Sequence, residues 1–213
     1  MGALEDPLVP GAGLPSATAV VAGSEQPAMH GMPSRPTAFH TLAKPIGPIC
    51  NLDCSYCFYL HKENFFPKGE NFKMSEEVLE KFIQQYIEGQ DVPQVDFAWQ
   101  GGEPTLLGVE FFRKAVELQK QYCPPEKTLT NAIQTNGVLL DDAWCEFLKA
   151  HDFLVGLSID GPKPLHDKYR VDKQGSSSFD AVMKGHACLQ RHGVRVNSLT
   201  AVNRANENHG REV

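Results

Sequence analysis

Short apolar segments alternate with amphipathic helix patterns along most of the chain, and this alternation constrains the fold more than any other feature. We expect strands at residues 40–46, 95–99, 128–134, 154–159 and 194–202. Helix patterns lie between or before them at residues 75–88, 109–122, 141–149 and 179–192. Strands that alternate with helices build parallel sheets from β/α units. The sequence therefore predicts an α/β fold with parallel strands and outer helices.

The predicted strands end in polar or glycine-rich clusters. The clusters are Gln100-Gly101-Gly102-Glu103-Pro104, Thr135-Asn136-Gly137 and Asp160-Gly161-Pro162. In β/α barrels the active site forms at the carboxyl ends of the strands, so these clusters are expected at one mouth. Five strands are too few to close such a barrel. We therefore predict a partial (β/α) barrel, truncated after about the fifth strand, in a fragment of a longer protein.

The first 36 residues differ in composition from the rest. They are rich in Gly, Pro, Ala and Ser and nearly lack aromatic side chains. Such a segment has too little apolar surface to form a packed core. We expect a disordered leader at residues 1–36 and one incomplete domain at residues 37–213.

Composition and charge exclude several classes of protein. The chain has 213 residues, is 41% hydrophobic and carries a net charge of −6, which argues against a nucleic-acid partner. No apolar run is long enough to span a bilayer, so no membrane partner is expected. Glu5 and Asp6 stand where a signal peptide needs positive charge. These features predict a cytoplasmic protein with unpaired cysteines.

Three cysteines, Cys50, Cys54 and Cys57, form a C-x3-C-x2-C triplet in the loop after the first predicted strand. Three thiolates can hold three irons of a 4Fe-4S cluster and leave the fourth iron open to another ligand. A purely electron-transferring cluster normally takes four protein ligands. The triplet therefore predicts a cluster at which chemistry takes place.

These cysteines have two alternative uses. A structural zinc site would need a fourth ligand, such as His61, but the usual second C-x2-C or H-x3-H element is absent. Disulfides are a poor account because the other cysteines are scattered singly. These are Cys123 at a helix end, and Cys145 and Cys188 in helix patterns as expected core residues. The histidines at 151, 166, 186, 192 and 209 show no metal-binding spacing among themselves.

Several motifs resemble those of the radical S-adenosylmethionine (SAM) enzymes. They are the triplet with Tyr56 before its last cysteine, and Gly101-Gly102-Glu103-Pro104 after the second strand. Longer phrases at residues 43–54, 99–106, 134–137 and 157–162 resemble the anaerobic sulfatase-maturating enzymes, within the peptide-modifying branch of that superfamily. The likeness covers about residues 37–213. It implies a partial barrel of the radical SAM type.

The resemblance also implies a role for each motif. The three cysteines would bind a 4Fe-4S cluster, whose open iron would chelate SAM. Tyr56 would lie against the adenine side, although a core aromatic is the alternative. Gly101 and Gly102 would let backbone carbonyls accept hydrogen bonds from the methionine ammonium. Glu103 would be a second acceptor, or else a solvated carboxylate at a helix start.

Two polar side chains from later loops complete the implied cofactor site. Ser158 would bond the ribose or the carboxylate of SAM, and Arg170 offers a fork that suits the methionine carboxylate. Without the resemblance, Arg170 would more often be exposed to solvent. Asp160 is more often a turn former than a catalyst. Thr135 and Asn136 are expected at the same mouth, again with turn formation as the alternative.

The family activity implied is that of an oxidoreductase. It converts a cysteine or serine of a sulfatase polypeptide to Cα-formylglycine through a 5′-deoxyadenosyl radical, with electrons from a donor such as flavodoxin or ferredoxin. The family's base aspartate and auxiliary clusters would lie beyond Val213, so no catalytic base is assigned. The alternatives are another peptide-modifying radical SAM enzyme, for example one that forms thioethers, and a zinc-stabilised non-catalytic domain.

Overall fold

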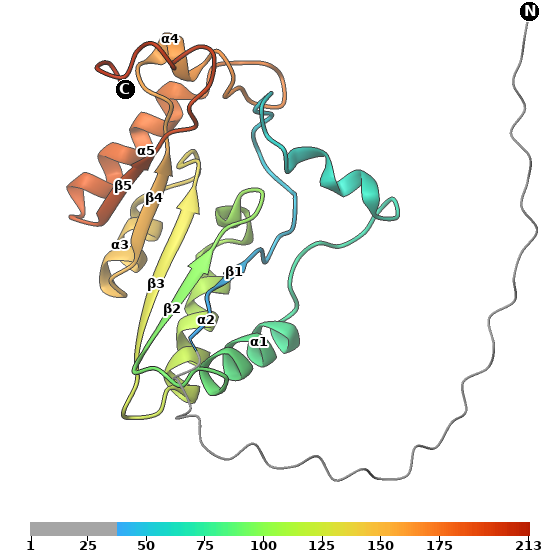
Figure 1. The fold of residues 1–213 in the computed structure, drawn as a ribbon, viewed down its shortest axis with the longest axis vertical. Helices are drawn as coiled ribbons and strands as arrows, with labels where there is room; N and C mark the ends of the chain where they lie inside the picture. Colours follow the sequence, from blue (N-terminus) through green and yellow to red (C-terminus); the bar gives the residue numbers. More distant parts are fainter. Residues whose placement is uncertain (1–37) are drawn as a thin grey trace, which may run out of the picture. The chain divides into compact units, whose positions relative to one another are not determined.

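A parallel five-stranded sheet forms the centre of the structure, a computed structural model that describes residues 38–213 (Figure 1). The predicted leader at residues 1–36 lies outside the described residues. The strands are β1 (Thr41–Ala43), β2 (Gln94–Trp99), β3 (Thr128–Thr135), β4 (Leu154–Ser158) and β5 (Arg195–Leu199). They lie in the order β1-β2-β3-β4-β5, and every neighbouring pair is parallel. All five predicted strands are therefore present.

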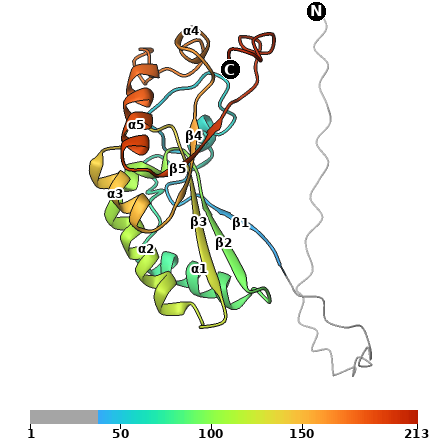
Figure 2. The same ribbon diagram turned by 90° about the vertical axis from the view of Figure 1, so that its left-hand side faces the viewer.

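Helices follow the strands as the periodicity predicts. The long ones are α1 (Glu76–Glu88), α2 (Val109–Tyr122), α3 (Asp142–Ala150) and α5 (Phe179–Arg191). Figure 2 shows α2, α3 and α5 on the same side of the sheet. Three short helices were not predicted, because segments of four to six residues carry too little periodicity. They are η1 (Leu60–Phe65), η2 (Pro104–Leu107) and α4 (Lys163–His166).

Side-chain caps fix where two of the helices begin. The Ser75 hydroxyl accepts a hydrogen bond from the backbone N–H of Val78 at 3.2 Å, which confirms the predicted start of α1. The Asp141 carboxylate accepts one from the backbone N–H of Trp144 at 2.9 Å and so precedes α3. Each cap satisfies one of the N–H groups that have no partner within the helix.

The core lies between one face of the sheet and the helices. Val95, Phe97 and Trp99 of β2 point to this face, and each is only 1% exposed. The Trp99 ring packs edge-on against Phe112 of α2, with centroids 5.7 Å apart. Full burial of such side chains contributes roughly 1.5–3 kcal/mol each. The opposite face of β2 is only half-buried, as the inner face of an open barrel segment would be.

The strand register brings the carboxyl ends of the strands to one edge. Trp99 pairs with Ile133, Thr135 with Leu157, and Ser158 with Leu199. The loops that follow β2, β3, β4 and β5 therefore leave the sheet side by side.

No helix within residues 38–213 is long and apolar enough to cross a membrane.

Candidate functional site

A cavity of about 480 Å³ opens at the carboxyl ends of the strands. Sites for small molecules commonly have volumes of about 300–1,000 Å³. Every metal and cofactor residue that the sequence predicted lies in its lining. These residues are Cys50, Cys54, Cys57, Tyr56, Gly101, Gly102, Glu103, Ser158 and Arg170. The structure thus brings the predicted residues together, and their binding roles stay predictions.

The three cysteines lie on a loop that is tied to a second loop near Arg170. Backbone N–H groups of Asp53 and Ser55 donate to the carbonyls of Val171 and Tyr169, at 2.8 and 3.0 Å. The cysteine side chains are all half-buried. Burial raises the pKa of the Cys50 thiol, and it raises that of Cys54 to about 11. Metal binding at Cys50 and Cys54 therefore has to displace a thiol proton from each.

The arrangement of the three sulfur atoms argues against a compact zinc site. A zinc ion holds its thiolates at about 2.3 Å, so their sulfur atoms lie about 3.8 Å apart. Within residues 38–213, the sulfur atoms of Cys50, Cys54 and Cys57 do not all gather within 4.8 Å of one another. His61, the zinc ligand considered above, is exposed and does not line the cavity. The wider arrangement fits a 4Fe-4S cluster, in which each thiolate binds a different iron.

The glycine pair allows the cysteine loop to pass close to the end of β2. A methyl group on Gly102 would lie only 1.9 Å from the carbonyl oxygen of Ile49. The backbone N–H groups of Gly102 and Glu103 donate to the carbonyls of Gly47 and Ile49, at 2.7 and 2.8 Å. The sequence indicated a close approach of ligand to backbone here. The structure shows that the cysteine loop itself also requires the missing side chain.

Glu103 is a buried carboxylate that joins two strand ends. It is 1% exposed, so the solvated alternative is wrong. Its oxygens accept hydrogen bonds from the Thr105 hydroxyl at 2.6 Å, the Thr135 hydroxyl at 2.7 Å and the Asn136 backbone N–H at 2.7 Å. Burial raises the pKa of Glu103, and these hydrogen bonds oppose the rise. Thr135 and Asn136 thus hold Glu103 in addition to forming a turn.

Asp160 and Arg170 form a second buried network. The Arg170 Nε and Nη2 atoms donate to the two carboxylate oxygens of Asp160, at 2.9 and 3.2 Å. The Tyr56 hydroxyl and the Ala201 backbone N–H also donate to this carboxylate. Arg170 is 9% exposed, so the solvent-exposed alternative is wrong. Asp160 is an acceptor for four donors, which turn chemistry alone did not predict.

Ser158, the last residue of β4, lies at the cavity wall and is 7% exposed. Its hydroxyl forms no hydrogen bond with another side chain of the described region. A hydroxyl in this position is available to donate to, or accept from, a ligand in the cavity.

Several other lining residues had no individual role in the sequence analysis, although Gln100 and Gln134 belong to its strand-end motifs. The ammonium group of Lys44 bonds the Gln100 side-chain oxygen at 2.8 Å and lies 4.4 Å from the centre of the Tyr59 ring. Burial lowers the pKa of Lys44. Gln100 also bonds the Gln134 side chain across two strand ends. Gln100 and Gln134 both lie at strand ends, and this position alone predicts that they line the cavity.

Comparison with known proteins identifies the family. The model of the radical SAM superfamily matches residues 45–212. The chain belongs to the radical SAM superfamily. This result agrees with the cysteine loop and the strand-end motifs that line the cavity.

Several similar proteins are sulfatase-maturating enzymes. The chain is 49% identical over 164 residues to a serine-type anaerobic sulfatase-maturating enzyme of Bacteroides thetaiotaomicron, covering 77% of the chain and 39% of that relative. It is 39% identical over 165 residues to a cysteine-type enzyme of Clostridium perfringens (strain ATCC 13124), covering 76% and 43%. The chain thus spans less than half the length of these relatives. The predicted resemblance to this group is confirmed.

Solved structures support the same fold. The structure of native anSMEcpe with bound AdoMet matches with a TM-score of 0.73 and 39% identity, covering 80% of this chain and 46% of that one. Streptococcus suis SuiB matches with a TM-score of 0.54 at 18% identity and bears on the fold alone. The predicted α/β fold with a partial barrel of the radical SAM type is confirmed.

Proposed function

We propose that this chain forms the cofactor-binding part of a radical SAM maturase. Cys50, Cys54 and Cys57 hold a 4Fe-4S cluster, and SAM binds beside it in the cavity. The observation that carries this proposal is the lining of one cavity by all three thiols together with the glycine pair, Ser158 and Arg170. When bound, the cluster and SAM supply a carbon radical that abstracts hydrogen, and the protein supplies binding and orientation.

The polar groups of the cavity bind the methionine part of SAM. Backbone carbonyls at Gly101 and Gly102 accept hydrogen bonds from its ammonium group. Arg170 and Ser158 bind its carboxylate. Asp160 takes two of the Arg170 N–H bonds, which fixes the plane of the guanidinium while its remaining donors serve the ligand. The Tyr56 hydroxyl is held by Asp160, and its ring is assigned to the adenine side of SAM.

Glu103 acts through its neighbours in this proposal. Its carboxylate accepts hydrogen bonds from Thr105, Thr135 and Asn136, which occupies both oxygens. We therefore assign Glu103 to holding the ends of β2 and β3 in register, and the predicted contact with the SAM ammonium becomes secondary.

The proposed substrate is a sulfatase polypeptide, in which a cysteine or serine is oxidised to Cα-formylglycine. The names of the similar proteins support this class, since both serine-type and cysteine-type sulfatase-maturating enzymes are among them. A flavodoxin or ferredoxin in the cytoplasm would supply the electrons. The rival is a thioether-forming radical SAM maturase, which would share the cofactor site and differ in its substrate.

Anaerobic reconstitution with iron and sulfide tests the cofactor site. We expect a brown chain with about four irons and a 4Fe-4S signal on reduction, because three thiols face one cavity. Cys54→Ala should lose most of this iron, whereas Cys123→Ala, a half-buried cysteine outside the cavity, should keep it. A colourless chain that binds zinc instead would contradict the cluster. With SAM and reductant, we expect at most slow, uncoupled 5′-deoxyadenosine.

A chimera tests the substrate class separately. Residues 45–212 would replace the matching part of the Bacteroides thetaiotaomicron relative. We expect this chimera to form an aldehyde on a sulfatase peptide with cysteine or serine at the target position, detected by mass and by an aldehyde-reactive probe. The Cys54→Ala chimera is the control. A chimera that cleaves SAM but modifies neither peptide would favour the thioether-forming class.

A further inference from the structure

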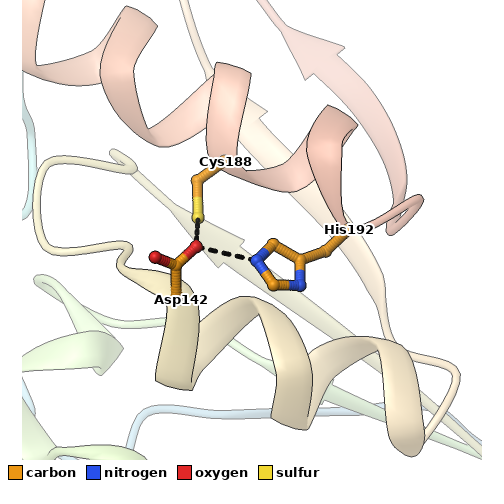
Figure 3. Close-up of side chains that lie close together, drawn as sticks. All are labelled: Asp142, Cys188 and His192. Carbon is orange, nitrogen blue, oxygen red and sulfur yellow. Dashed lines mark hydrogen bonds and ion pairs between the residues drawn. The ribbon is translucent and has the colours of Figure 1, made fainter.

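Three potential metal ligands meet on the outer helices, away from the cavity. Asp142 of α3, Cys188 of α5 and His192 at the end of α5 point toward one another (Figure 3). One oxygen, one sulfur and one nitrogen atom from these side chains all lie within 4.8 Å of one another. None of the three residues is in the lining of the cavity described above. This cluster therefore has no part in the proposed SAM site.

We propose that Asp142, Cys188 and His192 form a binding site for a divalent transition metal, with Zn²⁺ as the best match. Thiolate, imidazole and carboxylate are the three ligand types that zinc takes in proteins. Three protein ligands leave a fourth position for water. The site goes beyond the proposed function, because it uses other residues and needs neither SAM nor the cluster.

The helices place the three ligands without strain. Cys188 and His192 are four residues apart on α5, so they share one face of that helix. Asp142 is the first residue of α3, where the neighbouring helix passes. Cys188 is 4% exposed, as expected for a core residue, and its sulfur reaches the Asp142 carboxylate at the helix boundary.

Two distances from Asp142 Oδ1 can be compared with those of a tetrahedral zinc site. Zinc with bonds of about 2.0–2.3 Å to O, N and S holds its ligand atoms about 3.3–3.6 Å apart. The Cys188 sulfur is 3.4 Å from Asp142 Oδ1, which already matches. The His192 Nε2 atom is 2.7 Å from the same oxygen. It would move outward by roughly half an ångström when a metal replaces the proton between them.

The guanidinium group of Arg191 contacts both the Asp142 carboxylate and the Cys188 sulfur. The Arg191 Nη2 atom lies 2.6 Å from Asp142 Oδ1 and 3.5 Å from the Cys188 sulfur. The Arg191 side chain is 61% exposed, so it can turn into solvent. Cys188 and His192 contact the same Asp142 oxygen, so one carboxylate oxygen is the meeting point of all three groups.

The charges also match a divalent cation. An ionised Asp142, a Cys188 thiolate and a neutral His192 together carry two negative charges, which Zn²⁺ neutralises. Binding releases the thiol proton and displaces the Arg191 guanidinium, so it is favoured as pH rises. The imidazole binds through Nε2, the atom that now faces Asp142.

Cobalt binding tests the site, because Co²⁺ replaces Zn²⁺ and absorbs light in a way that reports thiolate ligands. The chain with Cys50→Ala, Cys54→Ala and Cys57→Ala removes the thiols of the cavity. We expect it to bind one equivalent of Co²⁺ with a thiolate-to-cobalt charge-transfer band, which one equivalent of Zn²⁺ abolishes. In this background, Cys188→Ala should lose the band, and His192→Gln should weaken binding at least tenfold.

Two variants serve as matched controls. His209→Gln removes another histidine paired with a carboxylate, Glu212, where no thiol is near. Cys123→Ala removes a half-buried thiol that is not part of the cluster. Both should bind Co²⁺ like the background, and Zn²⁺ should raise the thermal midpoint of all chains that keep the three ligands.

Other results would overturn the site. One is a missing charge-transfer band at millimolar Co²⁺; the others are a band that survives Cys188→Ala and an affinity that His192→Gln leaves unchanged. If Cys188→Ala does not fold, His192→Gln decides alone, because His192 is a half-buried C-cap residue that is not part of the hydrophobic core.

Discussion

Asp160 and Asp142 accept hydrogen bonds from similar partners in opposite surroundings. Each binds an arginine and further donors on its carboxylate. The Asp160 side chain is 0% exposed at the cavity, whereas that of Asp142 is 65% exposed on the outer helices. Water screens the surface pair, and leaving one partner of a buried pair alone is costly. The buried Asp160 network is therefore a fixed part of the structure around the cavity. The exposed Asp142 network can exchange the Arg191 guanidinium for another cation.

Asp160→Asn should produce the largest effect on stability. It keeps the shape of the side chain but leaves the buried Arg170 guanidinium without its counter-charge. We expect the free energy of unfolding to fall by about 3–5 kcal/mol in urea titrations followed by circular dichroism. A loss no greater than that of Asp142→Asn would show that burial does not separate the two networks.

Gly102→Ala should come next. Its methyl group would overlap the Ile49 carbonyl oxygen and push the cysteine loop away from β2. Overpacking of this kind typically lowers the free energy of unfolding by about 1–3 kcal/mol. We also expect the variant to bind less iron than the wild type after reconstitution. Gly210→Ala is the control, because a methyl group there meets nothing within 4 Å. Equal behaviour of the two variants would disprove the close approach.

His166, which contacts the buried Asp160 network, should make the stability of the chain depend on pH. It is 0% exposed; its Nδ1 atom accepts from the Asp160 backbone N–H, and Nε2 faces the Ser178 hydroxyl. Burial, then the charge of Arg170, lowers the pKa of His166, so it stays neutral in the folded chain. Below about pH 6.5 the unfolded chain binds the extra proton, and the free energy of unfolding falls.

The measurement compares wild type with His166→Gln between pH 7 and pH 5.5. The wild type should lose stability more steeply as pH falls, by no more than about 1.4 kcal/mol per pH unit for one proton. Parallel stability curves for the two chains would mean that His166 titrates alike in the folded and unfolded states.

Asp142→Asn should have the smallest effect. In metal-free buffer the thermal midpoint should barely change, because the Asp142 carboxylate and its Arg191 partner are both exposed to water. In zinc-containing buffer the variant should lack the rise in midpoint expected of the wild type. A large loss without metal would show that this surface network is structural after all.

Periodicity was sufficient to predict the main elements. The bounds of α2 agree with the sequence at both ends, since the apolar repeat runs from Val109 to the residues before Pro124. The outer strands β1 and β5 are shorter than predicted. Each pairs with a single neighbour in the described region, so fewer ladder hydrogen bonds extend it.

The candidate site was predictable as a set of residues but not as a network. Parallel topology alone places the strand ends together, which is why the motif residues share a cavity. Which side chains bond to Glu103 and Arg170 depends on the directions of those side chains, and residue spacing in the sequence does not predict these directions. The Asp142 cluster was not predicted for a related reason, because 46 residues separate Asp142 from Cys188.

The set of donors around Asp160 also implies an order of assembly during synthesis. The Tyr56 hydroxyl comes from 104 residues earlier, and the Ala201 N–H arrives 41 residues later. Closing such loops costs entropy that only the finished contacts repay. The ribosome must therefore release the segment after β5 before the carboxylate has all its donors. Until then the Asp160 carboxylate, which also accepts from Tyr56 of the cysteine loop, lacks one of its four donors.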